Sequence, residues 1–161
     1  GSNIDPADNI ERALEQLDEF APIVRVSNFY ITQPLERPEQ ATYRNGAVRI
    51  EFARGPRALK FEVLRAIEEA LGRKRGADRF AARTIDLDVV LYGDAVTDDG
   101  ELALPHPDVF ARAFVAAPLL DIEPALRIPG SGWASDLDCV KDAALEVDAE
   151  LTQRLKERWN K

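Results

Sequence analysis

Apolar residues recur every three or four positions in several stretches of the chain, which is the spacing of an amphipathic helix. Asp5 followed by Pro6 is typical of a helix start, and we predict a first helix from Pro6 to Phe20. Pro56 and Gly72 are typical of the start and the end of a second helix. The apolar face of that helix would consist of Leu59, Val63, Leu64, Ile67 and Leu71.

Two further helices are expected in the second half of the chain. The segment 109–120 predicts a short helix with an apolar face. Near the C-terminus, apolar steps of four residues predict a last helix, over 143–159, that docks on the rest of the domain. Its apolar stripe is formed by Val147, Leu151, Leu155 and Trp159.

Strand patterns alternate with these helices. Residues 23–31 and 43–52 predict an antiparallel pair, joined by a loop from Thr32 to Pro38 whose prolines no regular element can hold. Further strands are predicted over 83–93 and 102–104. This order of elements predicts an α+β fold, a ferredoxin-like sandwich whose mainly antiparallel sheet carries helices on one face and is open to a ligand on the other. We expect residues 1–161 to form a single domain.

Two carboxylates interrupt the apolar strand predicted over 83–93. Strand side chains alternate between faces, so Asp86 and Asp88 are expected on one face. Like charges held this close repel each other and lose hydration, unless a divalent cation lies between them or each finds a donor. The alternative is a solvated outer face on which both acids pair with nearby arginines. The opposite face would carry Ile85, Leu87, Val89 and Leu91.

Composition narrows the class of protein. The 161 residues are 45% apolar, enough for one core, and the formal charge of −8 argues against nucleic acid or an anionic membrane as the main partner. There is no membrane-length apolar stretch and no signal-peptide pattern. The lone Cys139 cannot form an internal disulfide. We therefore expect a cytoplasmic protein, and a monomer.

Positive charge is concentrated in one segment of this acidic chain. Between residues 73 and 83, five cations face only Asp78 as a counter-charge. An anionic ligand would therefore bind there. The cations are Arg73, Lys74, Arg75, Arg79 and Arg83.

Several short motifs, in their order and spacing, resemble those of the hydroxymethyl-dihydropterin pyrophosphokinases of the folate pathway. The Arg-Thr-Ile-Asp-Leu-Asp string at 83–88 is highly specific by itself, and the resemblance spans roughly residues 1–124. The motifs are Gly1-Ser2-Asn3, Tyr43-Arg44-Asn45, Ile67-Glu68 followed by Leu71-Gly72-Arg73, Arg83 to Asp88, Pro105-His106-Pro107, and Arg112-Ala113-Phe114.

The resemblance implies transfer of a pyrophosphoryl unit from ATP to 6-hydroxymethyl-7,8-dihydropterin, leaving AMP. It assigns Asp86 and Asp88 to two Mg²⁺ ions, in keeping with the few carboxylates that Mg²⁺ needs beside phosphate oxygens. Together with these acids, Arg73 and Arg83 would act in catalysis. The residues that the resemblance implies for ATP are Glu68, Arg73, Arg75, Phe80, Arg83, His106 and Arg112.

A flat pterin needs a ring to stack on and an amide to bind its edge. Tyr43, Phe114 and Asn45 match the family positions for this, although both aromatics would otherwise be read as core residues. His106, the one histidine, could equally be a local hydrogen-bonding residue. The implied pterin pocket consists of Thr32, Gln33, Pro34, Leu35, Tyr43, Asn45 and Phe114.

The chain departs from the family pattern in places. Phe80 stands where tryptophan is frequent, Glu36 where glycine is usual, and Glu101 where some members have arginine. The family's first, central strand would precede Gly1, and we expect it to be absent from this chain. Two other functions stay open: a non-catalytic α+β module that binds nucleotide or pterin, and a Mg²⁺-dependent nucleotidyltransferase that would release pyrophosphate.

Overall fold

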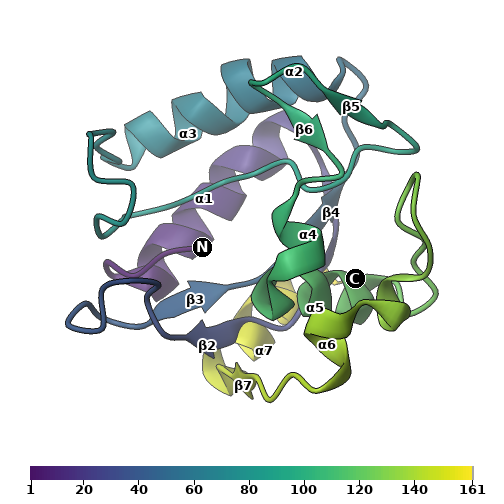
Figure 1. Ribbon diagram of the computed structural model, residues 1–161. Helices are drawn as coiled ribbons and strands as arrows, with labels where there is room; N and C mark the ends of the chain where they lie inside the picture. Colours follow the sequence, from purple (N-terminus) through teal and green to yellow (C-terminus); the bar gives the residue numbers. More distant parts are fainter. Residues whose placement is uncertain (161) are drawn as a thin grey trace.

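The computed structural model describes residues 1–160 as an α+β fold with small antiparallel sheets (Figure 1). The first helix, α1 (Pro6–Phe20), has the predicted bounds. Asp5 stands at its N-cap, but its backbone is left-handed (φ 40°) and its side chain makes no capping bond. The Asp5 carbonyl accepts the Asn9 N–H at 3.0 Å, the first bond of the helix, so Asp5 is at the predicted helix start.

The structure has two short strands in place of each of the longer strands predicted over 23–31 and 43–52. β1 (Ile23–Val26) pairs with β4 (Val48–Ile50), and β2 (Tyr30–Thr32) pairs with β3 (Tyr43–Asn45). Both pairings are antiparallel, as predicted. The ladder breaks between them because backbone groups there bond elsewhere.

Three contacts account for this break. The Ala47 N–H donates to the Ser27 hydroxyl at 2.8 Å, and the Phe29 N–H donates to the Thr152 hydroxyl at 2.9 Å. Gly46 lies against the Phe29 ring, and a Cβ there would come within 2.7 Å of it. The sequence pattern alone could not reveal these tertiary partners.

The second helix is continuous but not uniformly α-helical. It comprises α2 (Pro56–Ala58), a π-helical stretch (Leu59–Leu64) and α3 (Arg65–Ala70). Gly72 follows with a φ of 78°, a left-handed conformation that favours glycine, and ends the helix as predicted. In Figure 1 this helix lies over α1.

The segment that carries Asp86 and Asp88 is not a regular strand, so that prediction was wrong. The Asp86 N–H donates to the Gly1 carbonyl at 2.7 Å, and the Asn3 N–H donates to the Arg83 carbonyl at 3.2 Å. The Leu87 N–H bonds a side chain rather than a neighbouring strand, which interrupts a ladder. The alternation of faces nevertheless holds, because Ile85 and Val89 are buried in the core while both aspartates line a pocket.

Gly1 to Asn3 lies between two parts of the fold. Ser2 forms a β-bridge with Arg44 of β3, through bonds of 3.1 and 2.8 Å. Its other neighbour is the Asp86 segment, through the Gly1 and Asn3 bonds given above. These three residues thus connect the β2–β3 pair to the segment that carries the aspartates.

The second half of the chain differs from prediction at element boundaries. A hairpin of β5 (Thr97–Asp98) and β6 (Ala103–Leu104) follows the Asp86 segment and lies beside α2 in Figure 1. The helix predicted over 109–120 is two helices, α4 (Asp108–Ala111) and α5 (Ala113–Ile122). They are separated by Arg112, whose backbone is extended. A 3-10 turn (Ala134–Asp136) and α6 (Asp138–Lys141) come next.

The last helix, α7 (Ala149–Trp159), begins later than predicted. Asp148 caps it by accepting the Leu151 N–H at 3.0 Å. The two residues before this cap form β7 (Glu146–Val147), which pairs with β2, so Val147 is in a strand and 40% exposed. Beyond α7, the Asn160 side chain accepts the Val26 N–H at 2.7 Å and donates to the Val26 carbonyl at 3.0 Å.

The main core lies between α1, the second helix, β1, the Asp86 segment and α7. It contains apolar residues from all five, and a second cluster fills the space between α4, α5 and α6. Within residues 1–160, no helix has both the length and the apolar character needed to cross a membrane. The apolar side chains of the Asp86 segment therefore pack in the core, and the polar side chains of the segment face the pockets.

Candidate active site

Asp88 lines two pockets, and the larger of these has a volume of about 460 Å³ and is walled by segments far apart in sequence. Strands β2 and β3, the loop 33–40, the basic segment 79–83 and the start of α5 all contribute. Asp86 and Asp88 both line it, which brings the two predicted acids together on one surface.

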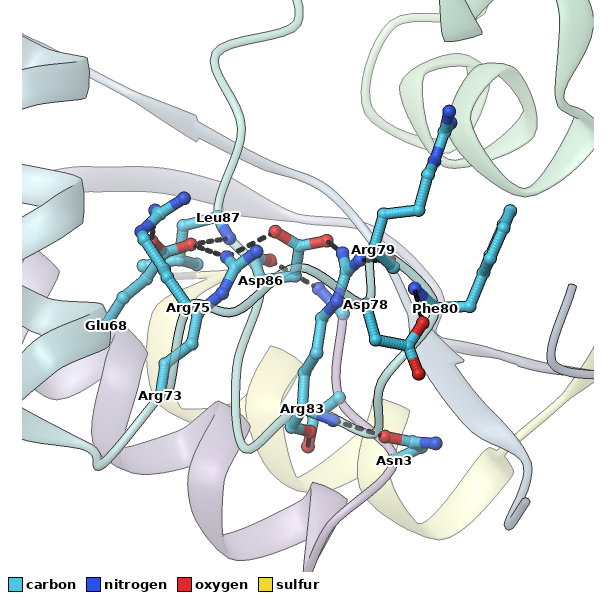
Figure 2. Close-up of polar contacts among 12 residues, drawn as sticks. Asn3, Glu68, Arg73, Arg75, Asp78, Arg79, Phe80, Arg83, Asp86 and Leu87 are labelled. Carbon is cyan, nitrogen blue, oxygen red and sulfur yellow. Dashed lines mark hydrogen bonds and ion pairs between the residues drawn. The ribbon is translucent and has the colours of Figure 1, made fainter. Parts of the chain in front are cut away.

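Asp86 is held by cations on two sides. Arg73 donates to its Oδ1 at 2.5 Å, and Arg83 donates to its Oδ2 (Figure 2). Asp88 is exposed, and within residues 1–160 no hydrogen bond or ion pair to its carboxylate is found. The Asp86 carboxylate therefore has two arginine partners and the Asp88 carboxylate has none among the described residues, although the two acids are only two residues apart.

The pKa values of the two carboxyls shift in opposite directions. Burial alone would raise the pKa of Asp86, but nearby positive charges, those of Arg73 and Arg83 among them, outweigh it, and the pKa lies below its ordinary value. For Asp88, desolvation by the surrounding protein and then the negative charge of Asp86 raise the pKa above its ordinary value. The charged form of Asp88 is thus disfavoured unless a cation lies beside it, which favours a cationic ligand.

Glu68 organises the arginines behind the larger pocket. Its side chain is only 2% exposed and accepts hydrogen bonds from Arg73 and Arg75. Its Oε1 also accepts the Leu87 N–H at 2.8 Å, which ties the second helix to the Asp86 segment (Figure 2). Arg73 therefore bridges two carboxylates, since it also binds Asp86.

A smaller pocket of about 180 Å³ adjoins the first on the other side of Asp88. Its walls come from the β5–β6 hairpin, from Lys60 of the second helix, and from His106 and Pro107. Asp88 lines both pockets, so a ligand that spans them passes this carboxylate. The His106 Nδ1 accepts the Asp108 N–H at 3.2 Å.

The structure brings together all the residues predicted to bind a pterin. Each of the seven lines the larger pocket. The Asn45 amide donates to the Thr32 hydroxyl at 2.8 Å, which orients its carbonyl oxygen away from β2. The seven are Thr32, Gln33, Pro34, Leu35, Tyr43, Asn45 and Phe114.

The residues predicted to bind ATP are more dispersed. Phe80, Arg83 and Arg112 line the larger pocket, and His106 lines the smaller one. Glu68, Arg73 and Arg75 line neither pocket and form the ion-pair cluster behind them. Arg112 reaches the pocket because its extended backbone interrupts the α4–α5 helix.

Two loops that wall the larger pocket are joined to each other by side chains that sequence reasoning missed. Arg37 binds Asp78 at 2.8 Å, and the Gln40 amide donates to the Phe80 carbonyl at 3.0 Å. Asn3 donates to the Gln40 oxygen at 3.3 Å and accepts the Arg83 N–H at 2.8 Å. No periodic signal marks such contacts, because they join irregular segments.

A divalent metal would have to be held by these two aspartates and by its own substrate. Within residues 1–160 there is no group of three or more His, Cys, Asp or Glu side chains that could hold an ion. Mg²⁺ suits a two-carboxylate site, because it keeps water and phosphate oxygens as its other ligands. The unpartnered oxygens of Asp88 fit this requirement.

Two neighbouring carboxylates and converging arginines beside a pocket are typical of enzymes that act on polyphosphates. Residues 1–124 match the family described as 7,8-dihydro-6-hydroxymethylpterin-pyrophosphokinase (HPPK). The chain belongs to this family.

Curated relatives are similar in sequence to this chain over most of its length. A 2-amino-4-hydroxy-6-hydroxymethyldihydropteridine pyrophosphokinase of Methylorubrum extorquens is 38% identical over 160 residues, which cover 97% of this chain and 95% of the relative. Enzymes of the same name from Pseudomonas aeruginosa and Haemophilus influenzae are 38% and 35% identical, and cover 80% and 85% of this chain. The matches cover 80% and 86% of those two relatives.

Proposed function

We propose that the protein transfers the terminal diphosphate of ATP to 6-hydroxymethyl-7,8-dihydropterin, which gives AMP and the pterin diphosphate. Membership of the pyrophosphokinase family supports this reaction. The observation that carries it is the position of Asp88, whose carboxylate lines the pterin-sized pocket and the smaller pocket at once. We propose that the acceptor lies in the larger pocket and the nucleoside of ATP in the smaller one.

The chemistry requires an in-line exchange at the β-phosphorus. The hydroxymethyl oxygen forms a bond to that phosphorus, and the bond to the oxygen shared with the α-phosphate breaks. The electron pair stays on this oxygen as AMP leaves, and the hydroxyl proton passes to water. Such transfers depend on alignment and on stabilisation of the shifting negative charge.

Asp86 and Asp88 would hold Mg²⁺, two ions in our proposal, and bound Mg²⁺ would neutralise phosphate charge. Arg83 lies at the pocket wall and can turn from Asp86 to a phosphate oxygen, because its side chain is 25% exposed. Arg73 is more buried and is fixed between Glu68 and Asp86, so it would position Asp86 and contribute positive charge from behind. Arg112 lines the larger pocket and Arg75 is 53% exposed in its ion pair with Glu68, so both would be available to the polyphosphate.

The larger pocket offers what a pterin needs. Tyr43, Phe80 and Phe114 supply ring faces, and Asn45 supplies an amide for the edge of the heterocycle. Burial raises the pKa of the Tyr43 phenol above its ordinary value. A phenol O–H can donate a hydrogen bond to a ligand in the pocket.

We also propose that residues 1–161 are one domain with the ferredoxin-like arrangement that the resemblance implies. The hydrogen bonds of Gly1 to Asn3 with both β3 and the Asp86 segment support a central position for these residues in that arrangement. The separate short sheets would then be one interrupted sheet.

Chromatographic detection of AMP tests the function directly. The protein is incubated with ATP and Mg²⁺, with and without the pterin alcohol, and we expect AMP release that depends on both Mg²⁺ and the pterin. Asp88→Asn should reduce turnover by about 100-fold or more while the fold stays intact, because the metal-binding charge is lost. Asp94→Asn is the matched control, since Asp94 is exposed in a turn and lines neither pocket.

Three outcomes would contradict the proposal. Near-normal AMP release by Asp88→Asn would rule out the metal assignment. Binding of both ligands without AMP release would indicate a non-catalytic module. Release of pyrophosphate in place of AMP would indicate a nucleotidyltransferase.

A further inference from the structure

The smaller pocket contains one lysine among acidic residues. Lys60 lines it together with Asp88, Asp98 and Glu101. Glu101 is bound by Arg57 at 2.7 Å, so its charge is already neutralised. An Asp98 oxygen accepts the Gly100 N–H at 3.0 Å, which uses that carboxylate in the hairpin turn.

Lys60 itself has only neutral partners within the described residues. Its ammonium donates to the Glu101 backbone carbonyl and lies 5.3 Å from the centre of the Phe61 ring. No carboxylate within residues 1–160 lies within ion-pair distance of it. An ammonium has three N–H donors, so this arrangement fixes its position and leaves donors and charge available.

The backbone at Lys60 is unusual as well. Lys60 belongs to the π-helical stretch Leu59–Leu64, and its carbonyl accepts the Arg65 N–H, five residues further on. Turns of this kind are rare and occur frequently at functional sites. Here the stretch presents Lys60 to the hairpin while its neighbours Leu59 and Val63 are buried in the core.

We infer that Lys60 is a nucleotide-binding residue, which donates to a phosphate oxygen near the nucleoside when ATP lies between the smaller pocket and Asp88. The inference rests on the proposed function for the position of ATP. It adds a cation from the second helix to those of the basic segment 73–83. From the sequence alone, Lys60 would be interpreted as a solvated helix residue. The inference depends on the position of Lys60 in the wall of the smaller pocket.

The test measures binding by titration calorimetry with three probes: α,β-methylene-ATP with Mg²⁺, adenosine, and the pterin alcohol. Lys60→Ala should weaken binding of the ATP analogue by about tenfold, because one charge-assisted hydrogen bond is lost. Binding of adenosine and of the pterin should change by less than about twofold, since neither carries a phosphate. Lys60→Arg should restore most of the affinity for the analogue.

Two control variants separate a binding role from a structural one. Arg54→Ala removes an exposed arginine that pairs with Glu62 and lines neither pocket. Arg65→Ala removes another cation over the Phe61 ring. Neither should alter binding of the analogue as Lys60→Ala does.

Equal losses for the analogue and adenosine, or equal losses in Arg54→Ala and Lys60→Ala, would overturn the inference. Unchanged binding in Lys60→Ala would overturn it too. Failure of the unmodified protein to bind the analogue would overturn both proposals. Analogue binding without AMP release would overturn the proposed function alone, because the role of Lys60 is judged by binding.

Discussion

The inner and outer sides of the larger pocket are built in opposite ways. On the inner side, Glu68, Arg73 and Asp86 are linked by ion pairs of low exposure, with side chains 2%, 12% and 24% exposed. On the outer side, the loops 33–42 and 73–83 meet through Arg37 and Asp78, whose side chains are 41% and 48% exposed. Both sides use the same chemistry, a guanidinium on a carboxylate.

Burial makes the energetic difference between them. A buried pair cannot lose one partner without leaving a desolvated charge, whereas an exposed pair exchanges its partner for water at little cost. The inner cluster should therefore be rigid and hold the Asp86 segment in place. The outer pair should open and reclose as substrates enter and leave.

The largest effect is expected from the centre of the inner cluster. Glu68→Ala should lower the free energy of unfolding by about 3–5 kcal/mol, because two arginines and the Leu87 N–H lose their acceptor. Chemical denaturation measures this. Glu69→Ala, on the exposed side of the same helix, is the matched control and should change stability little. Equal stability of both variants would show that the cluster is not rigidly coupled.

An intermediate effect is expected at the pocket floor between the two sides. Asn45→Leu should weaken pterin binding by about tenfold or more, because the polar edge of the pterin would then face an apolar side chain. Binding of the ATP analogue should hardly change, since Asn45 does not line the smaller pocket. Titration of each ligand separately checks this. Similar losses for both ligands would contradict the assignment of the larger pocket to the pterin.

The smallest effect is expected at the outer pair. Arg37→Ala should raise the KM for the pterin by about two- to threefold, with kcat less affected, because exposed ion pairs contribute little. Exchange of the two residues, Arg37→Asp with Asp78→Arg, should restore part of the loss. Steady-state kinetics at low and high salt measure this, and the difference from wild type should shrink at high salt.

The pH dependence of this pair follows from Asp78. The Phe80 N–H, followed by Arg37, lowers the pKa of its carboxyl. A lowered pKa in the folded state means that the contribution is complete above the ordinary pKa and is lost as the pH falls through the lowered value. The effect of Arg37→Ala on KM should therefore persist in mildly acidic buffer. Its disappearance already near neutral pH would contradict the ion pair.

Local pattern predicted some of this architecture well. The bounds of α1, the end of the second helix at Gly72 and the shared face of Asp86 and Asp88 depend on spacing within a few residues, which sequence displays directly. The break at Arg112 and the start of α7 at Asp148 were missed. At both positions the backbone groups have more than one possible hydrogen-bond partner, and contacts between distant parts of the chain determine which partner is used.

The same limit applies to the site. The acids and the seven pocket residues could be predicted, because family motifs mark them in sequence. The link from Glu68 to Leu87, the Arg37–Asp78 pair and the position of Lys60 join segments distant in the chain. Charged side chains in such segments look alike in sequence whether they are solvated or buried.

The amide of Asn160 has a consequence for how the protein behaves in concentrated solution. Its two bonds to Val26 occupy both polar backbone groups of this β1 residue. A bare strand margin is where a second molecule can add its own strand and begin a fibril. The Asn160 amide takes the place of such a strand at Val26, so pairing between molecules at this position of β1 is blocked.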